Sequence, residues 1–278
     1  MAAARLPAVL IRSWNLFHGN TLPPRRHDEL ETMVRLAAED EPEIVCLQEV
    51  PPWALERLGA WSGLQVFAAV AARPSLGPLP STAALGRAIT ALHHGLLRSA
   101  FSGQANAILV ASWLGAEDAG ALVLNARGFR RAQGRWLELP LVARLAWAKE
   151  RRIAHAVRIR LRDGRGVCVV NLHATAYPPD GRIAAAEILR AAVFADAVAR
   201  PDDVAVLAGD FNVFAGSQVL KELTGPDWGF SGPGLGPRID HVLVRGAELG
   251  RISVWDDERR GLDGRLLSDH APVEVVVE

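Results

Sequence analysis

Short apolar runs alternate along the chain with segments of helical periodicity. The apolar runs predict strands at Val9–Trp14, Glu43–Gln48, Gln65–Val70, Ala107–Ser112, Ala121–Leu124, Ile153–Leu161, Val167–Leu172, Val204–Ala208, His241–Val244 and Val273–Val277. Val157, Ile159 and Leu161 alternate with arginines, which predicts a strand with one buried and one solvent-exposed face. The run from Val204 to Ala208 is apolar throughout, which predicts a strand covered on both faces.

Two segments show the spacing of helices. Leu30, Met33, Val34 and Ala37 follow i, i+3, i+4, i+7 spacing, which predicts an amphipathic helix, and the segment from Gly181 to Ala199 predicts a second one. Many strands with a few helices between them indicate an α/β fold, layered in the α+β manner, with two sheets. No strong linker divides the chain, so we expect one catalytic domain over residues 1–278, with an insertion at residues 73–103.

The composition narrows the class of protein. The chain has 278 residues with 31 basic and 31 acidic side chains, which excludes a polybasic tail and charge-driven disorder. Its apolar runs are shorter than the roughly 20 residues of a membrane span, and the N-terminus lacks a secretory apolar core. Cys46 and Cys168 lie in apolar runs, as is typical of reduced thiols. We therefore expect a cytoplasmic protein without a transmembrane segment. The sequence leaves the oligomeric state open, with a monomer favoured.

Side chains that handle metals or protons follow the apolar runs at six places. These are Asn15, Gln48-Glu49, Asn171-Leu172-His173, Gly209-Asp210-Phe211-Asn212, Arg238-Ile239-Asp240-His241 and Ser268-Asp269-His270-Ala271-Pro272. One carboxylate after a strand is more often a turn former or a helix cap. Six such clusters indicate a site, because ligand sites in layered α/β folds gather at strand ends.

The residue types agree with one chemistry. Four carboxylates and two amides supply oxygen donors, namely Glu49, Asp210, Asp240, Asp269, Asn15 and Asn212. Oxygen ligands favour Mg²⁺ or Mn²⁺ over zinc, and no Cys/His cluster has zinc spacing. His173 and His270 add imidazoles that titrate or contact an anion. The set suits hydrolysis of a phosphate ester, and the absence of a Walker-type loop argues against nucleotide-driven work.

In this order the clusters resemble the endonuclease/exonuclease/phosphatase superfamily, which includes deoxyribonuclease I, exonuclease III, neutral sphingomyelinases and inositol-polyphosphate phosphatases. The most specific pieces are Leu47-Gln48-Glu49, Gly209-Asp210-Phe211-Asn212 and Ser268-Asp269-His270, and the stretch from Gly103 to Leu109 is also similar. The resemblance implies a four-layered sandwich of two mixed β-sheets with outer helices.

The resemblance also implies roles for single residues. Glu49 would be the principal metal ligand, with Asn15 and Asp269 beside it. Asp210 would orient or deprotonate the attacking water, and Asn212 would hold that water and the phosphate.

The imidazoles would act on the phosphate itself. His270 would contact a non-bridging oxygen with Asp240 hydrogen-bonded behind it, and an ionised Asp240 would raise the pKa of His270. His173 would lie on the opposite side as an acid or an electrostatic clamp. Three further residues, Asn171, Asn106 and Trp228, are expected to bind substrate.

Other polar residues are assigned smaller roles. His18 and Asn20 either line the cleft or form a turn. His93-His94 and Arg151-Arg152 are expected to be solvated, and His241 to pack in the core, since it points away from Asp240 on its strand.

The substrate is a phosphate ester, and we expect a nuclease acting on DNA or RNA. Apart from Trp228 and Phe230, the loop before Arg238 is small and glycine-rich, unlike the aromatic loop of abasic-site nucleases. The alternatives are a phosphatase, or a phospholipid or sphingomyelin phosphodiesterase. A non-catalytic binding protein is a third class, which the intact clusters disfavour.

Overall fold

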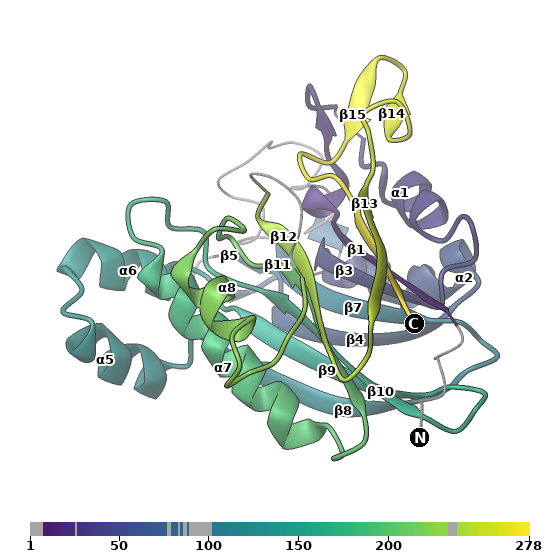
Figure 1. The fold of residues 1–278 in the computed structure, drawn as a ribbon. Coiled ribbons are helices and arrows are strands. Elements are labelled where there is room, and N and C mark those ends of the chain that lie inside the picture. Colours follow the sequence, from purple (N-terminus) through teal and green to yellow (C-terminus); the bar gives the residue numbers. More distant parts are fainter. Residues whose placement is uncertain are drawn as a thin grey trace.

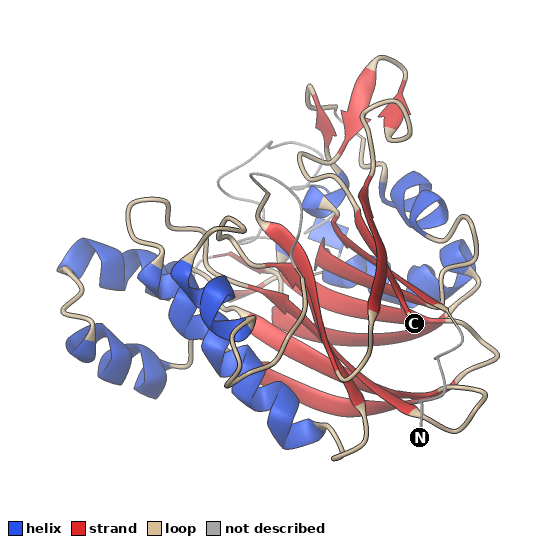
Figure 2. Cartoon of the chain, in the orientation of Figure 1, coloured by secondary structure: helices blue, strands red, loops and turns tan. Residues whose placement is uncertain are grey.

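The computed structural model describes residues 8–25, 27–76, 79–82, 84–85, 88, 102–232 and 238–278. Two mixed β-sheets pack face to face, and helices cover the outer face of each sheet (Figures 1 and 2). The expected four-layered sandwich is therefore confirmed. Most of the 73–103 insertion, including His93-His94, lies outside the described residues.

One sheet has six strands. In spatial order they are β13 (Leu249–Val254), β16 (Val273–Val277), β1 (Val9–Asn15), β3 (Ile44–Val50), β7 (Gln104–Val110) and β4 (Gln65–Ala72). Only the pair formed by β1 and β3 is parallel. Parallel neighbours end at the same edge of a sheet, so the ends of β1 and β3 lie together.

The other sheet has five strands. In spatial order they are β12 (Asp240–Arg245), β11 (Val204–Asp210), β10 (Gly166–His173), β9 (Ile153–Arg160) and β8 (Gly115–Val123). Here β10 and β11 are parallel, and β12 runs antiparallel to β11. The edge where β10 and β11 end is therefore the edge where β12 begins.

Three apolar layers hold the sandwich together. Ile11 and Ile44 of one sheet pack against Val169 and Val206 of the other in the central layer. The helices α1 (Leu30–Ala37) and α2 (Leu58–Ser62) cover the six-stranded sheet, and α7 (Arg182–Val198) and α8 (Gln218–Leu223) cover the five-stranded sheet. Every residue of β11 is buried, as its continuous apolar run predicted.

All the predicted strands are present, with ends that differ by a few residues. The largest difference is in β8, which begins at Gly115, well before the predicted strand. Its first half is exposed and polar, so it has no apolar pattern that could predict it. The sequence pattern missed β13, α8 and two helices between β8 and β9, α5 (Arg127–Trp136) and α6 (Leu141–Lys149). Short elements complete the fold, namely η1 (Phe17–Gly19), β2 (Thr21–Leu22), η2 (Pro52–Arg57), β5 (Ser75–Leu76), β6 (Leu79–Pro80), β14 (Gly261–Leu262) and β15 (Arg265–Leu267).

Cys46 and Cys168 are both free and buried, as predicted. Among the described residues, no helix is long and apolar enough to cross a membrane.

Candidate active site

The strand register brings three of the predicted residues side by side. His173 at the end of β10 is paired with Asp210 at the end of β11, and Asp210 is paired with Asp240 at the start of β12. On the facing sheet, Asn15 at the end of β1 is paired with Gln48 of β3. The ends of five strands, from both sheets, thus meet at one edge of the sandwich.

Glycine is required where β11 approaches this edge. Gly209 has a φ of +139°, and a Cβ atom there would lie 1.9 Å from the carbonyl oxygen of Leu172. Only a residue without a side chain allows β10 and β11 to come this close. The backbone conformation of Gly209 therefore positions the carboxylate of Asp210.

Four other residues of the site have left-handed backbone conformations. The φ angles are +54° at Glu49, +52° at Asn212, +62° at Ser268 and +53° at His18. Glu49 also lies in a register shift between β3 and β7, and such bulges re-aim side chains. Non-glycine residues seldom adopt this conformation, and they cluster at functional sites.

Asn15 links the carboxylates of the two sheets. Its Nδ2 donates to Oδ2 of Asp210 at 3.0 Å and lies 3.4 Å from Oε1 of Glu49. Nε2 of His173 lies 3.4 Å from the same Asp210 oxygen and 3.8 Å from the same Glu49 oxygen. Glu49 and Asp210 therefore face one small volume although they come from different sheets.

His270 completes the site from the last loop. Its Nδ1 lies 2.7 Å from Oδ2 of Asp240, and its Nε2 lies 3.9 Å from Asp210 and 3.8 Å from Asp269. The loop is held by Ser268, whose Oγ donates to the carbonyl oxygen of Asn15 at 2.6 Å. Trp14 Nε1 also donates to the carbonyl oxygen of His270 at 2.9 Å.

The two imidazoles have opposite protonation tendencies. For His270, burial opposes the charged form, but Asp240 and the other nearby carboxylates outweigh burial and raise the pKa to about 10. For His173, burial first, and then the charges of Arg152 and His270, lower the pKa well below its ordinary value. At neutral pH His270 is therefore the charged partner of this pair and His173 the neutral one.

Three carboxyl groups of the site, those of Asp210, Glu49 and Asp269, are destabilised as anions. Burial raises the pKa of Asp210 to about 7, with Asp240 adding to the rise. Burial likewise raises the pKa of Glu49 and of Asp269. Buried acids of this kind gain most from a nearby cation.

The donor set fits a hard divalent cation. Glu49 and Asp210 present carboxylate oxygens in one place, and such oxygens suit Mg²⁺ or Mn²⁺, whereas Asn15 turns Nδ2 toward them and its Oδ1 accepts the backbone amide of Phe17 at 3.0 Å. Ligand atoms of Asp210, Asp240 and His270 also lie within 4.8 Å of one another. His270 is a poor ligand, however, because its Nδ1 is engaged by Asp240 and its protonated ring offers no lone pair.

Three residues expected to bind substrate have other surroundings. Asn171 is fully buried, donates to the carbonyl oxygens of Leu47 and Ala107 and accepts from Gln48, so it ties the two sheets together. Asn106 is also buried, and its amide donates to backbone carbonyl oxygens.

Trp228 also has other surroundings. Its ring packs against the core beneath α7 and α8, and its carbonyl oxygen accepts from Arg245. Arg245 lies at the end of β12 opposite to Asp240, about 17 Å along the strand. The ring of Trp228 therefore packs in the core, far from the cluster of Asp210, Asp240 and His270.

Arg152 is the main residue that sequence reasoning misjudged. It is only 7% exposed, and Nη1 lies 2.9 and 3.0 Å from the two ring nitrogens of His173. An ion pair with Glu150 at 2.8 Å holds the guanidinium there. The antiparallel pairing of β9 and β10 sets this contact, and that register is not readable from the sequence. Arg151 is exposed, as expected.

The structure decides the open alternatives for His18, Asn20 and His241. His18 Nε2 lies 3.3 Å from Oε2 of Glu49, so His18 lines the site. The side-chain Nδ2 of Asn20 donates to the carbonyl oxygen of Phe17, and the backbone carbonyl oxygen of Asn20 accepts from the amide of Ser268. Asn20 therefore forms a turn. His241 is buried and contacts the carbonyl oxygen of Val213, as expected.

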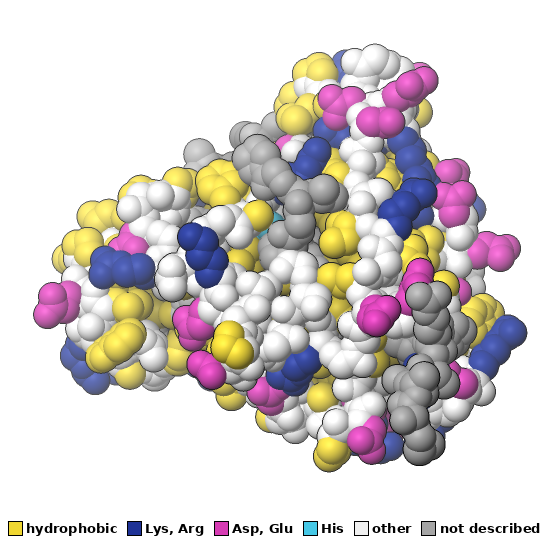
Figure 3. Space-filling model, viewed as in Figure 1, with side chains coloured by type: hydrophobic (Ala, Val, Ile, Leu, Met, Phe, Trp, Pro, Cys, Tyr) yellow, Lys and Arg dark blue, Asp and Glu magenta, His cyan; other side chains and the backbone are white. Residues whose placement is uncertain are grey.

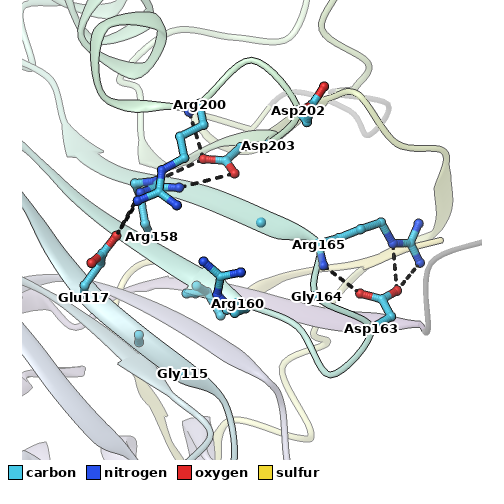
Figure 4. Close-up of a pocket in the computed structure, with 13 residues that line it drawn as sticks. Gly115, Glu117, Arg158, Arg160, Asp163, Gly164, Arg165, Arg200, Asp202 and Asp203 are labelled. Atoms are coloured by element: carbon cyan, nitrogen blue, oxygen red, sulfur yellow. Dashed lines mark hydrogen bonds and ion pairs between the residues drawn. The ribbon is translucent and has the colours of Figure 1, made fainter.

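A cavity of about 610 Å³ lies at the other end of the five-stranded sheet. Its charged side chains largely pair with one another, with Arg158 bridging Glu117 and Asp203 and Arg165 bound to Asp163 (Figure 4). The length of β10 separates it from His173 by about 23 Å. It therefore plays no part in the cluster at the strand ends.

The chain is similar to known proteins over nearly its whole length. The model of the endonuclease/exonuclease/phosphatase family matches residues 13–270. A structure of an endonuclease/exonuclease/phosphatase from Beutenbergia cavernae DSM 12333 has 14% identity and a TM-score of 0.66, covering 98% of this chain and 71% of that one. No match is found among curated proteins.

Two further structures share the fold at 14% identity. One is D. rerio TDP2 complexed with a single-strand DNA product, with a TM-score of 0.59 and coverage of 98% of this chain and 99% of that one. The other is a mannosyl-6-phosphatase from Bacteroides thetaiotaomicron VPI-5482, with a TM-score of 0.60 and coverage of 97% and 99%.

Proposed function

The chain belongs to the endonuclease/exonuclease/phosphatase family, whose members hydrolyse phosphoester bonds, and from that premise we propose that it is a magnesium-dependent phosphodiesterase acting on DNA or RNA. The observation that carries the proposal is the convergence of Asp210, Asp240 and His270 beside Glu49 and Asn15 of the facing sheet.

Asp210 is the proton acceptor in this proposal. Its pKa of about 7 is close to the pH at which a general base works best. Its Oδ1 accepts the backbone amide of Asn212 at 3.0 Å, which leaves Oδ2 facing the cluster. Asp210 thus takes a proton from the attacking water, and Asn212, whose Nδ2 donates to the carbonyl oxygen of Ala174 at 3.0 Å, would hold that water and the phosphate.

His270 is the electrostatic partner of the phosphate. Asp240 holds Nδ1, so the Nε2–H of the imidazolium is available to a non-bridging oxygen. His173 remains neutral and, with Arg152 against it, lies beside Asp210, with Nε2 3.4 Å from Oδ2 of that carboxylate. Donors fixed in advance around developing negative charge stabilise the transition state.

A Mg²⁺ or Mn²⁺ ion held by Glu49, with Asp269 nearby, would supply positive charge at the phosphate, and Asn15 would act by holding the Glu49 and Asp210 carboxylates through Nδ2. Glu49 is fit for this because burial makes its anion costly without a cation.

A basic pocket beside the site supports a substrate with more than one phosphate. A cavity of about 330 Å³ is lined by Arg127, Arg130 and Arg151, with Glu150 as the single acid. Glu150 binds Arg152, so this pocket adjoins the residues that contact His173. Arginines suit successive phosphates of a nucleic-acid backbone.

The test compares substrate classes under one condition. Single-stranded DNA, RNA, plasmid DNA and a sugar phosphomonoester are assayed with Mg²⁺ and with excess chelator. We expect metal-dependent cleavage of a nucleic acid, lost in Asp210→Asn and His270→Gln and kept in the distant control Asp202→Asn. Turnover of the phosphomonoester alone would refute the substrate assignment. Unchanged activity in Asp210→Asn would refute the mechanism.

A further inference from the structure

The helices α5 and α6 form a hairpin that projects from the sheet edge carrying the site. The hairpin leaves β8 after Val123 and enters β9 at Ile153, and these two residues are paired. The next strand, β10, has Leu172 opposite Ala154, so His173 lies at the same edge. In Figure 1 the hairpin stands out from the body of the sandwich beside α7.

The inner face of this hairpin is firmly attached. Leu139, Ala143 and Trp147 pack with Ile183 of α7 in a small core of their own. Trp147 Nε1 also donates to Oε1 of the buried Glu187 at 2.6 Å. The orientation of the hairpin, and hence of its outer face, is therefore set by the fold.

The outer face of the hairpin is apolar and exposed. Trp136 is 78% exposed, Leu141 71%, Val142 67% and Leu145 61%. Leu141 and Leu145 are four residues apart on α6, so with Val142 they share one side of the helix. Soluble proteins rarely leave large apolar side chains together in water, and such patches mark interaction surfaces.

The same hairpin is strongly basic although the whole chain is neutral. Residues 127–149 contain six basic side chains and one acidic one, Glu138, which gives a net charge of +5. The other residues must then carry −5, because the chain has 31 basic and 31 acidic side chains. In Figure 3 basic and hydrophobic side chains lie next to each other over this lobe.

We propose that the α5–α6 hairpin docks on a membrane surface that contains anionic phospholipid. Aliphatic side chains and a tryptophan enter the boundary between headgroups and acyl chains, and arginines bind the anionic headgroups. A nucleic acid would satisfy the arginines but would leave Leu141, Val142 and Leu145 in water. The negative remainder of the chain is repelled by the same surface, so the hairpin is the part that meets the lipid.

The test is sedimentation with vesicles, and it does not depend on catalysis. Vesicles of phosphatidylcholine alone are compared with vesicles containing one third phosphatidylglycerol, at low and high salt. We expect at least tenfold tighter binding to the anionic vesicles, weakened by salt. The variants Leu141→Ser/Val142→Ser/Leu145→Ser and Arg131→Glu/Arg135→Glu should each lose at least tenfold.

Control variants outside the hairpin test whether a loss of vesicle binding is specific to the hairpin. Val193→Ser removes an apolar side chain that is 58% exposed on α7, and Arg162→Glu/Arg251→Glu makes the same change of charge away from the hairpin. Both should bind like the wild type. Absent binding, equal binding to the two vesicle types, or full binding by both hairpin variants would overturn the proposal. Retention by an oligonucleotide but by neither vesicle would also overturn it.

Discussion

Replacing Asp240 by asparagine tests the electrostatic design of the site. The side chain keeps its size and can still accept a hydrogen bond from Nδ1 of His270, which lies 2.7 Å away, but the negative charge is lost. Burial then dominates, and we expect the pKa of His270 to fall from about 10 to near neutrality.

The magnitude follows from the change in pKa. The His270 pKa of about 10 stands against an ordinary value of 6.5. At 1.36 kcal/mol for each pH unit, the imidazolium gains a net stabilisation of about 5 kcal/mol after the opposing effect of burial, and Asp240 is the largest of the stabilising carboxylates. A pKa that is raised in the folded state stabilises the fold fully below pH 6.5, and this stabilisation is lost as the pH rises through 10.

Two measurements on the metal-free protein check this reasoning. An NMR titration of the imidazole should show His270 protonated throughout pH 6–9 in the wild type and titrating within that range in Asp240→Asn. Urea unfolding should show the variant less stable near pH 6, with the difference shrinking above pH 10. A wild-type His270 that titrates near pH 6.5, or an unchanged titration in the variant, would refute the argument.

Four other predictions concern the site and its support. Asp210→Asn should lower the rate of hydrolysis about 10²–10⁴-fold without a change in circular dichroism. Glu49→Gln should raise the Mg²⁺ concentration needed for half-maximal activity at least tenfold, measured by titrating metal into chelated enzyme. Glu187→Ala leaves the buried donors of Trp147 and Thr175 unpaired and should cost about 2–4 kcal/mol in urea unfolding. Gly209→Ala should destabilise by more than about 3 kcal/mol, because its Cβ would clash with Leu172, and an unchanged melting temperature would contradict the close approach of β10 and β11.

The sequence alone determined most of the elements and most of the residues of the site. Apolar periodicity is local, because the side chains of a strand alternate between faces and those of a helix repeat every three or four residues. It therefore predicted strands such as β1 and β11 to within two residues at each end. It failed where an element faces water on most sides, as in the first half of β8 and in α5, since exposed positions carry no apolar signal.

Only the tertiary structure decided what the polar residues do. Asn171 and Arg152 are both polar residues beside strands, yet Asn171 ties the two sheets and Arg152 lies against His173. Register between strands and burial between sheets separate these roles, and both depend on residues that are distant in the sequence, 124 positions for Asn171 and Leu47 and 21 for Arg152 and His173. The opposite protonation tendencies of His173 and His270 have the same origin, since desolvation and neighbouring charge are properties of the folded site and not of the residue type.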